Sequence, residues 1–151
     1  MRRGLGVLLV LLATFGIAAG AGAQQQDPTM PCGQQASEFS LEQNFPNPFT
    51  AQTQTRIPFT LCESLFADGR RVVVSMRIVN VIHQFVASPT ALSHPAGEGV
   101  PAVQLEYFQP DRYFAAWDAR DQNGTPVVPG VYWVELTVNG AVARHRMFVS
   151  R

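Results

Sequence analysis

An all-β fold, built as a sandwich of two antiparallel sheets, is predicted by three features of the sequence. Apolar and polar residues alternate over several short stretches, which is the period of a half-buried strand. Gly, Pro, Asn and Asp interrupt these stretches about every 8 to 12 residues, and residues 24 to 151 show no helical period. The count is about seven strands. A closed barrel is the alternative, but a proline-rich first segment and unequal strand lengths favour the sandwich.

The first 23 residues are predicted to be a secretory signal peptide. Met1 to Arg3 give a basic start, residues 4 to 19 are almost wholly apolar, and residues 21 to 23 are small. A transmembrane anchor is the weaker interpretation, because glycines interrupt the apolar run and leave it short of the ~20 residues that span a bilayer. We therefore expect an exported chain, in the periplasm, at the cell surface or outside the cell, without a transmembrane anchor after signal cleavage.

Residues 24 to 40 have three consecutive glutamines, two prolines and no periodicity, which predicts a disordered lead before a single domain at 41 to 151. The domain begins with a proline-rich segment from Leu41 to Phe49. Its two X-Pro steps disfavour the helical conformation of the residue before each proline. Leu41, Phe45 and Phe49 are therefore expected to anchor an irregular segment on a sheet.

The first long strand is predicted over residues 54 to 61, with Ile57, Phe59 and Leu61 facing inward. Pro58 lacks a backbone N–H, so this strand is expected at a sheet edge or with that position facing solvent. After a turn at 67 to 70, a second long strand follows. Its inward residues are Val72, Val74, Met76 and Ile78.

Turns and shorter strands are predicted next. A turn at 80 to 83 leads to a short return strand at 84 to 87, and the Pro- and Gly-rich residues 88 to 102 are expected to form a surface loop. Alternation resumes at Val103, Leu105 and Tyr107. A bend at 110 to 112 then precedes a strand that contains Tyr113, Ala115 and Trp117.

The stretch from Trp117 to Val138 is the segment against which we expect the rest of the domain to pack. A turn rich in Asp, Asn, Gly and Pro precedes a strand whose inward residues are Tyr132, Val134, Leu136 and Val138. Its outward residues are Trp133, Glu135 and Thr137. Trp133 is expected either beneath the Phe45–Phe49 segment or in an interaction patch. Asn139-Gly140 predicts a type I′ hairpin to a last strand at 141 to 150, with Met147 and Val149 inward.

Cys32 and Cys62 are the only cysteines, and an exported chain meets an oxidising compartment. A disulfide between them is predicted, closing a loop of roughly 30 residues and contributing on the order of 3 kcal/mol in the chain-entropy model. The alternative is that both thiols are free and serve as small apolar residues.

The remaining residues give no pattern for catalysis, a cofactor or nucleic acid. All basic residues are arginines, and nine of them remain after signal cleavage against eleven acidic residues, so no basic patch is expected. His83, His94 and His145 lack metal-ligand spacing. Asp118, Asp121 and Asn123 before Gly124 match a calcium loop poorly, and their expected role is to cap backbone N–H groups, with calcium binding left open. No nucleophile-elbow motif or credible triad occurs.

Two blocks of the sequence resemble a known family. The first is Asn44-Phe45-Pro46-Asn47-Pro48-Phe49 with the strand after it, and the second combines Trp117-Asp118, Asn123-Gly124 and Gly130-Val131-Tyr132. Together they resemble the flagellar-hook-cap-like (FlgD-like) Ig domain family, to which the type IX secretion (Por) C-terminal sorting domains are similar. The resemblance covers residues 41 to 151.

This resemblance implies an Ig-like sandwich without catalysis. The expected function is that of an exported module for cell-surface attachment or protein–protein interaction. The alternative is a type IX sorting domain that directs translocation across the outer membrane. The expected partner is accordingly a protein or the secretion machinery, with no nucleic acid, small-molecule substrate, cofactor or metal.

Overall fold

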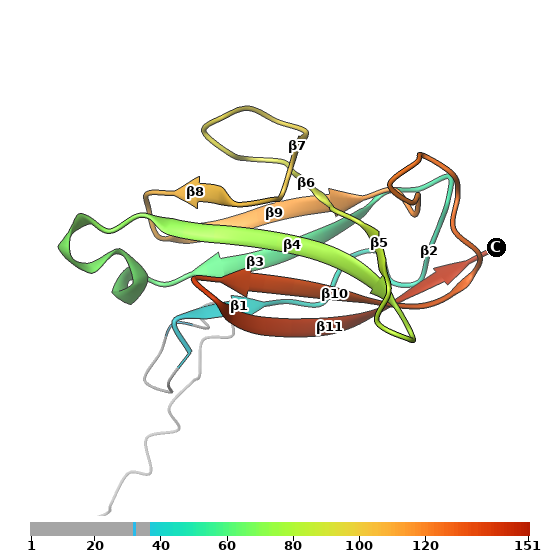
Figure 1. The fold of residues 1–151 in the computed structure, drawn as a ribbon, viewed down its shortest axis with the longest axis horizontal. Helices are drawn as coiled ribbons and strands as arrows, with labels where there is room; N and C mark the ends of the chain where they lie inside the picture. The colour runs from blue at the N-terminus through green and yellow to red at the C-terminus, as the bar shows by residue number, and fades with distance from the viewer. Residues whose placement is uncertain (1–31, 33–36) are drawn as a thin grey trace, which may run out of the picture.

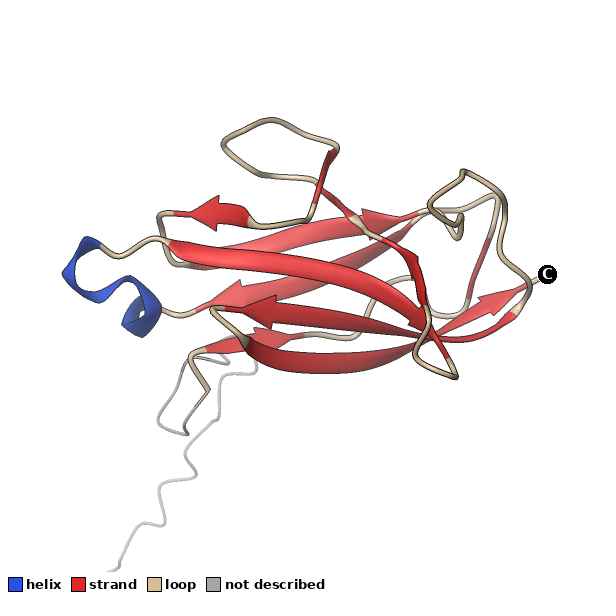
Figure 2. Cartoon of the chain, viewed as in Figure 1, coloured by secondary structure: helices blue, strands red, loops and turns tan. Residues whose placement is uncertain are grey.

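The computed structural model describes residue 32 and residues 37 to 151. The predicted signal peptide and most of the predicted lead lie outside these residues. Two sheets face each other along the length of the domain (Figure 1, Figure 2). The predicted all-β sandwich is confirmed. Within the described part of the chain, no helix is long and apolar enough to cross a bilayer.

Each sheet joins strands that are distant in sequence. In spatial order, sheet A contains β1 (Phe39–Leu41), β3 (Thr55–Leu61), β9 (Asp111–Trp117), β6 (Thr90–Ala91) and β7 (Val100–Pro101). Sheet B contains β2 (Phe49–Thr50), β11 (Ala141–Ser150), β10 (Gly130–Val138), β4 (Val72–Asn80) and β5 (Phe85–Ala87), with β8 (Leu105–Tyr107) also paired to β4. The pairing of β2 with β11 is parallel, and the other pairings among the described strands are antiparallel.

The seven predicted strands are present as β3, β4, β5, β8, β9, β10 and β11. The prediction missed β1, β2, β6 and β7, each of two or three residues, because such short strands show no alternation. The predicted loop at 88 to 102 accordingly contains the β6–β7 pair, and its tip projects from sheet A (Figure 1). A 3₁₀ helix, η1 (Glu63–Gly69), precedes β4, where only a turn was predicted.

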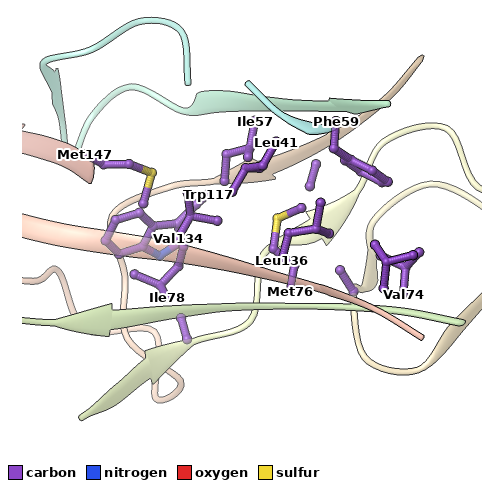
Figure 3. Close-up of a cluster of buried hydrophobic side chains, with 14 of the residues drawn as sticks. Leu41, Ile57, Phe59, Val74, Met76, Ile78, Trp117, Val134, Leu136 and Met147 are labelled. Atoms are coloured by element: carbon purple, nitrogen blue, oxygen red, sulfur yellow. The ribbon is translucent and has the colours of Figure 1, made fainter. Parts of the chain in front are cut away.

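The core lies between the two sheets and is formed by the predicted inward faces (Figure 3). Ile57, Phe59 and Leu61 of β3 are fully buried opposite the inward residues of β4 and β10. In sheet B the buried inward residues are Val72, Val74, Met76, Ile78, Tyr132, Val134, Leu136, Val138, Met147 and Val149. The period-2 pattern therefore assigned the inward side of every long strand correctly.

The first segment of the domain differs from its prediction in two ways. Sheet A already begins at Phe39, two residues before the expected domain start, because β1 pairs with β3. Leu41 and Phe49 are buried as expected, but Phe45 is 73% exposed, so its expected role as an anchor was wrong. Asn44 is the buried residue instead, donating from Nδ2 to the Thr55 hydroxyl at 2.8 Å and to the Pro46 carbonyl at 3.1 Å.

Neither expected setting of Pro58 is found, since β3 lies between β1 and β9 and Pro58 is buried, not facing solvent. The Glu42 N–H donates to the Pro58 carbonyl at 3.0 Å, just beyond the end of β1. In an antiparallel strand the N and O of one residue point to the same side. The missing N–H of Pro58 therefore faces the side where β1 has ended, and the pairing with β9 loses no hydrogen bond.

Two predicted covalent and backbone features are confirmed. Cys32 and Cys62 form a disulfide with their Cα atoms 5.5 Å apart. The Asn139-Gly140 turn has φ of 47° and 92° at these residues, as a type I′ hairpin requires, and Val138 pairs with Ala141 across it.

Candidate functional site

The residues behind the family resemblance meet in the core, where they have structural contacts. Trp117 lies edge-on to Phe49, with ring centroids 5.6 Å apart, and to Tyr132, at 5.4 Å. Its indole Nε1 donates to the Arg120 carbonyl at 2.8 Å, and the Tyr132 hydroxyl donates to the Val128 carbonyl at 2.7 Å. This aromatic group thus ties the two sheets and the β9–β10 turn together.

The proline-containing block closes the end of sheet B. The Phe45-Pro46 and Asn47-Pro48 peptide bonds are cis. Asn47 accepts the Phe148 N–H at 2.9 Å through Oδ1, and Phe49 then pairs with Val149. On the other side of β11, Gly130 pairs with the same Val149 as β10 begins. The block therefore satisfies backbone groups along the edge of β11.

The acidic residues of the β9–β10 turn are occupied by backbone N–H groups. Asp121 accepts from Asn123 at 2.8 Å and Thr125 at 2.9 Å, and Asp118 accepts from Arg120 at 3.1 Å. Gly124 adopts a φ of 78°, which closes the turn. An open cleft of about 490 Å³ lies beside these residues. These contacts are those of turn capping, and no group of three or more His, Cys, Asp or Glu in the described residues is placed to hold a metal.

An aromatic and cationic patch lies on the surface of sheet B that points away from sheet A. We call this surface the outer face. Strand register places Phe85, Val79, Trp133 and Arg146 in one row across β5, β4, β10 and β11. Phe85 is 48% exposed and Trp133 is half-buried, while Val79 between them is buried. Trp133 thus lies on the outer face between Val79 and Arg146, and its role in an interaction patch stays a prediction.

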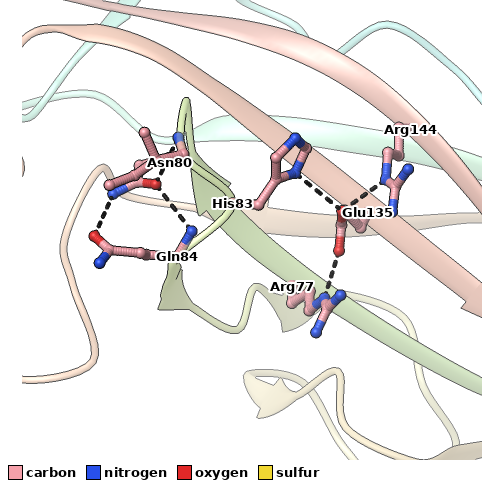
Figure 4. A network of polar contacts seen from close by, with 7 residues as sticks. Arg77, Asn80, His83, Gln84, Glu135 and Arg144 are labelled. Atoms are coloured by element: carbon pink, nitrogen blue, oxygen red, sulfur yellow. Dashed lines mark hydrogen bonds and ion pairs between the residues drawn. The ribbon is translucent and has the colours of Figure 1, made fainter.

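The next row of the outer face is a charged cluster around Glu135 (Figure 4). Glu135 of β10 pairs in register with Arg77 of β4 on one side and with Arg144 of β11 on the other. Its carboxylate accepts from Arg77 Nε at 2.5 Å and from Arg144 Nε at 2.6 Å, and His83 Nδ1 lies 4.0 Å away. The Glu135 side chain is only 2% exposed, whereas those of Arg77 and Arg144 are 58% and 50% exposed.

Glu135 is negatively charged at neutral pH. Burial raises the pKa of this carboxyl, but the hydrogen bonds from Arg77 and Arg144 outweigh that effect and bring the pKa below its ordinary value. A buried carboxylate without such partners would carry a large desolvation cost. The two arginines therefore stabilise a charge that the surrounding sheet would otherwise disfavour.

The folded domain is expected to lose stability in acid partly through Glu135. A carboxyl whose folded pKa lies below its unfolded value of ~4.3 stabilises the fold above that pH, and the contribution is lost as pH falls through the folded pKa. Glu42, whose pKa is lowered by its hydrogen bond from Arg112, acts in the same direction. Melting temperatures of the unaltered chain and Glu135→Gln, measured from about pH 6 to pH 3, should converge in acid. Parallel curves would contradict this assignment.

The cluster was only partly accessible to sequence reasoning, which placed Glu135 outward without a partner. The predicted Asn139-Gly140 turn already fixes the hairpin register, and that register puts Arg144 opposite Glu135. Arg77 could not be paired in the same way, because β4 and β10 are distant in sequence and their register depends on the whole sheet.

Comparison with known proteins gives matches at the level of the fold. No family model matches the chain, and no curated protein matches it. The resemblance to the FlgD-like family and to type IX sorting domains therefore stays a prediction. Among solved structures, the filamin domain of Lin-41 is 15% identical, covering 77% of this chain and 95% of its own, with a TM-score of 0.45.

Two further solved structures are much longer than this chain. PorZ, a surface component of the type IX secretion system of Porphyromonas gingivalis, is 20% identical over 72% of this chain and 11% of its own, with a TM-score of 0.40. The DNA glycosylase AlkC of Pseudomonas fluorescens is 16% identical over 76% and 31%, with a TM-score of 0.46. This chain thus spans a small part of either protein, and likeness this distant carries no functional argument.

Proposed function

We propose that this chain is an exported, non-catalytic Ig-like module that binds another protein through the outer face of sheet B. The observation that carries the proposal is the combination of half-exposed aromatic residues and exposed arginines on that one surface. Phe85 and Phe148 are 48% and 41% exposed, and Arg146 lies over the Phe148 ring with its Cζ 5.4 Å from the centroid. Aromatic residues and arginine are the types enriched in protein interfaces and their hot spots.

The absence of a reaction centre is part of the proposal. Several side chains that could have served chemistry have structural partners, as for Asp121 in the β9–β10 turn and Glu135 in sheet B. His94 accepts the Ala96 N–H through Nδ1 and contacts the Glu106 carbonyl through Nε2, which fixes the β6–β7 loop. These uses support an interaction module in preference to an enzyme.

Export is supported by the predicted signal peptide and by the disulfide. Cys32 and Cys62 are bonded in the structure, and disulfides persist mainly in the periplasm, at the cell surface and outside the cell. The setting of the proposed binding event is therefore the cell envelope or the extracellular space.

A type IX sorting domain is the second candidate function, and it rests on the two sequence blocks that meet around Trp117. The two functions predict different mature proteins. A sorting domain that is cleaved on delivery is lost from the surface form, whereas an interaction module is retained. Mass spectrometry of the mature ends separates them, because loss of residues 41 to 151 would favour the sorting function.

Exposed aromatic residues of the outer face provide the test of the proposed function. The double variant Phe85→Ser/Phe148→Ser should fold normally and lose about tenfold or more of its binding at the cell envelope, since interface hot spots are worth at least ~2 kcal/mol. The measurement is cell fractionation of the tagged protein in its native host. Phe45→Ser is the matched control, because Phe45 is 73% exposed and bridges to Arg56 of β3, in sheet A. Unchanged retention of a folded double variant would contradict the proposal.

A further inference from the structure

We infer that Arg77 and Arg144 form a clamp for carboxylates, which docks an acidic, extended segment of the partner protein on the outer face. The inference rests on the proposed function and specifies the chemistry of the partner. It depends on how Glu135 holds the two guanidinium groups, on the charge that remains exposed, and on the spacing of cations along β11.

Glu135 contacts each guanidinium through its Nε atom. Arg77 Nε donates to one carboxylate oxygen and Arg144 Nε to the other. Among residues 37 to 151, neither arginine donates a hydrogen bond from Nη1 or Nη2 to a protein group. An arginine binds a carboxylate most strongly through two parallel N–H groups, and here each arginine keeps its paired Nη donors for a ligand.

The Arg112–Glu42 pair on the other sheet shows a closed arrangement for comparison. Arg112 donates to Glu42 from Nε at 2.9 Å and from Nη2 at 2.7 Å, so the fork of the guanidinium is already occupied. The two clusters differ in the number of arginines that share one carboxylate. The buried Glu135 carboxylate serves two arginines, whereas the Glu42 carboxylate, which is 33% exposed, serves only Arg112.

The buried Glu135 carboxylate holds two exposed guanidinium groups in place. Its side chain is 2% exposed, while more than half of Arg77 and half of Arg144 remain accessible. A guanidinium already held at Nε loses less conformational freedom when it binds a ligand than a free arginine would. Glu135 is thus a positioning residue, and Arg77 and Arg144 are the binding residues.

Arg146 extends the cationic surface along β11. It lies two residues from Arg144 on the same side of the strand, a separation of roughly 6.6 to 6.8 Å. Carboxylates two residues apart in an extended peptide have the same spacing, so they can reach Arg144 and Arg146 together. The cluster and Arg146 combine three arginines with one glutamate, which leaves an excess of positive charge for an acidic segment to neutralise.

The neighbouring apolar side chains favour a polypeptide as the source of the carboxylates. Phe85, Trp133 and Phe148 lie in or beside the same rows as the arginines, so the apolar side chains between the acidic residues of a peptide have surfaces to contact. Arginine paired with flanking aromatic residues is the composition of a protein-binding hot spot.

A defined pair of peptides tests the clamp. The probe is a short synthetic peptide in which Glu alternates with Leu, and its control has every Glu replaced by Gln. Binding is measured by isothermal titration calorimetry up to about 1 mM peptide, the weak end of specific affinities. We expect the unaltered chain to prefer the Glu peptide, and Arg77→Gln/Arg144→Gln to bind it about tenfold or more weakly. Arg112→Gln, which removes a cation outside the clamp, should bind as tightly as the unaltered chain.

Glu135→Gln separates a positioned clamp from general charge attraction. This variant makes the protein more positive, so simple electrostatics predicts tighter binding of the Glu peptide. Loss of the shared carboxylate releases the guanidinium groups, so the clamp predicts weaker binding. Circular dichroism establishes that each variant is folded. Equal or tighter binding by folded Glu135→Gln would overturn the inference, as would no detectable binding of the Glu peptide to the unaltered chain.

Two further measurements distinguish a membrane ligand from a protein ligand, and the clamp from the proposed function. Vesicles containing phosphatidylglycerol provide a second probe, and clamp-dependent binding to them in preference to the Glu peptide would assign the site to a membrane. If Phe85→Ser/Phe148→Ser loses envelope retention while Arg77→Gln/Arg144→Gln keeps it, the clamp fails and the proposed function stands. If both variants are retained, the proposed function fails as well.

Discussion

Replacing Trp117 with alanine should lower the free energy of unfolding by about 3 to 5 kcal/mol, the usual cost of removing a large aromatic residue from a core. Trp117 is 3% exposed, and it contacts Phe49 and Tyr132 edge-on. The substitution also removes the hydrogen bond from its indole to the Arg120 carbonyl. A loss of this size is a large part of the total stability of a domain, which is about 5 to 15 kcal/mol.

The second tryptophan provides the matched control. Trp133 lies on the outer face and is half-buried, so Trp133→Ala creates no cavity between the sheets. Urea denaturation followed by circular dichroism compares both variants with the unaltered chain. Trp117→Ala should be much the less stable of the two. If the two substitutions cost the same, Trp117 does not have the central packing role assigned to it.

Removing the disulfide should lower the free energy of unfolding by about 3 kcal/mol, since the bond restricts the unfolded chain. Cys32 and Cys62 are separated by 30 residues, and the bond joins the segment before β1 to the end of β3. The double variant Cys32→Ser/Cys62→Ser should therefore unfold at a lower urea concentration. In the presence of a reductant, the unaltered chain should unfold at the same lowered urea midpoint as the double variant. A midpoint unaffected by both treatments would show that the crosslink does not stabilise the domain.

Residues with strictly local signals were predicted well. Tyr132, Val134 and Leu136 alternate with polar or half-buried neighbours, and all three are in the core. The Asn139-Gly140 turn required no long-range information, because positive φ at both positions is a property of the dipeptide. Where one face of a strand is buried, a period of two fixes its orientation, so these assignments follow from the sequence.

Residues whose environment depends on distant strands were predicted less well. Phe45 was expected to anchor its segment because it is large and apolar, yet Asn44 beside it is the buried residue, with Thr55 of β3 as its partner. Glu135 was expected to face outward, and it does, but Arg77 and Arg144 enclose it from the two adjacent strands. In both cases the deciding contact is made by a residue that the local pattern does not identify.

The most direct test of the proposed function is to measure whether a partner covers the outer face in the exported protein. Arginine-selective labelling with phenylglyoxal, read by mass spectrometry, compares the protein in its native envelope with the same protein after purification. We predict that Arg77 and Arg144 are protected in the envelope and labelled after purification, while Arg70, which lies at the end of η1 and is 69% exposed, is labelled in both. Equal labelling of Arg77 and Arg144 in the two preparations would contradict a partner bound to the outer face.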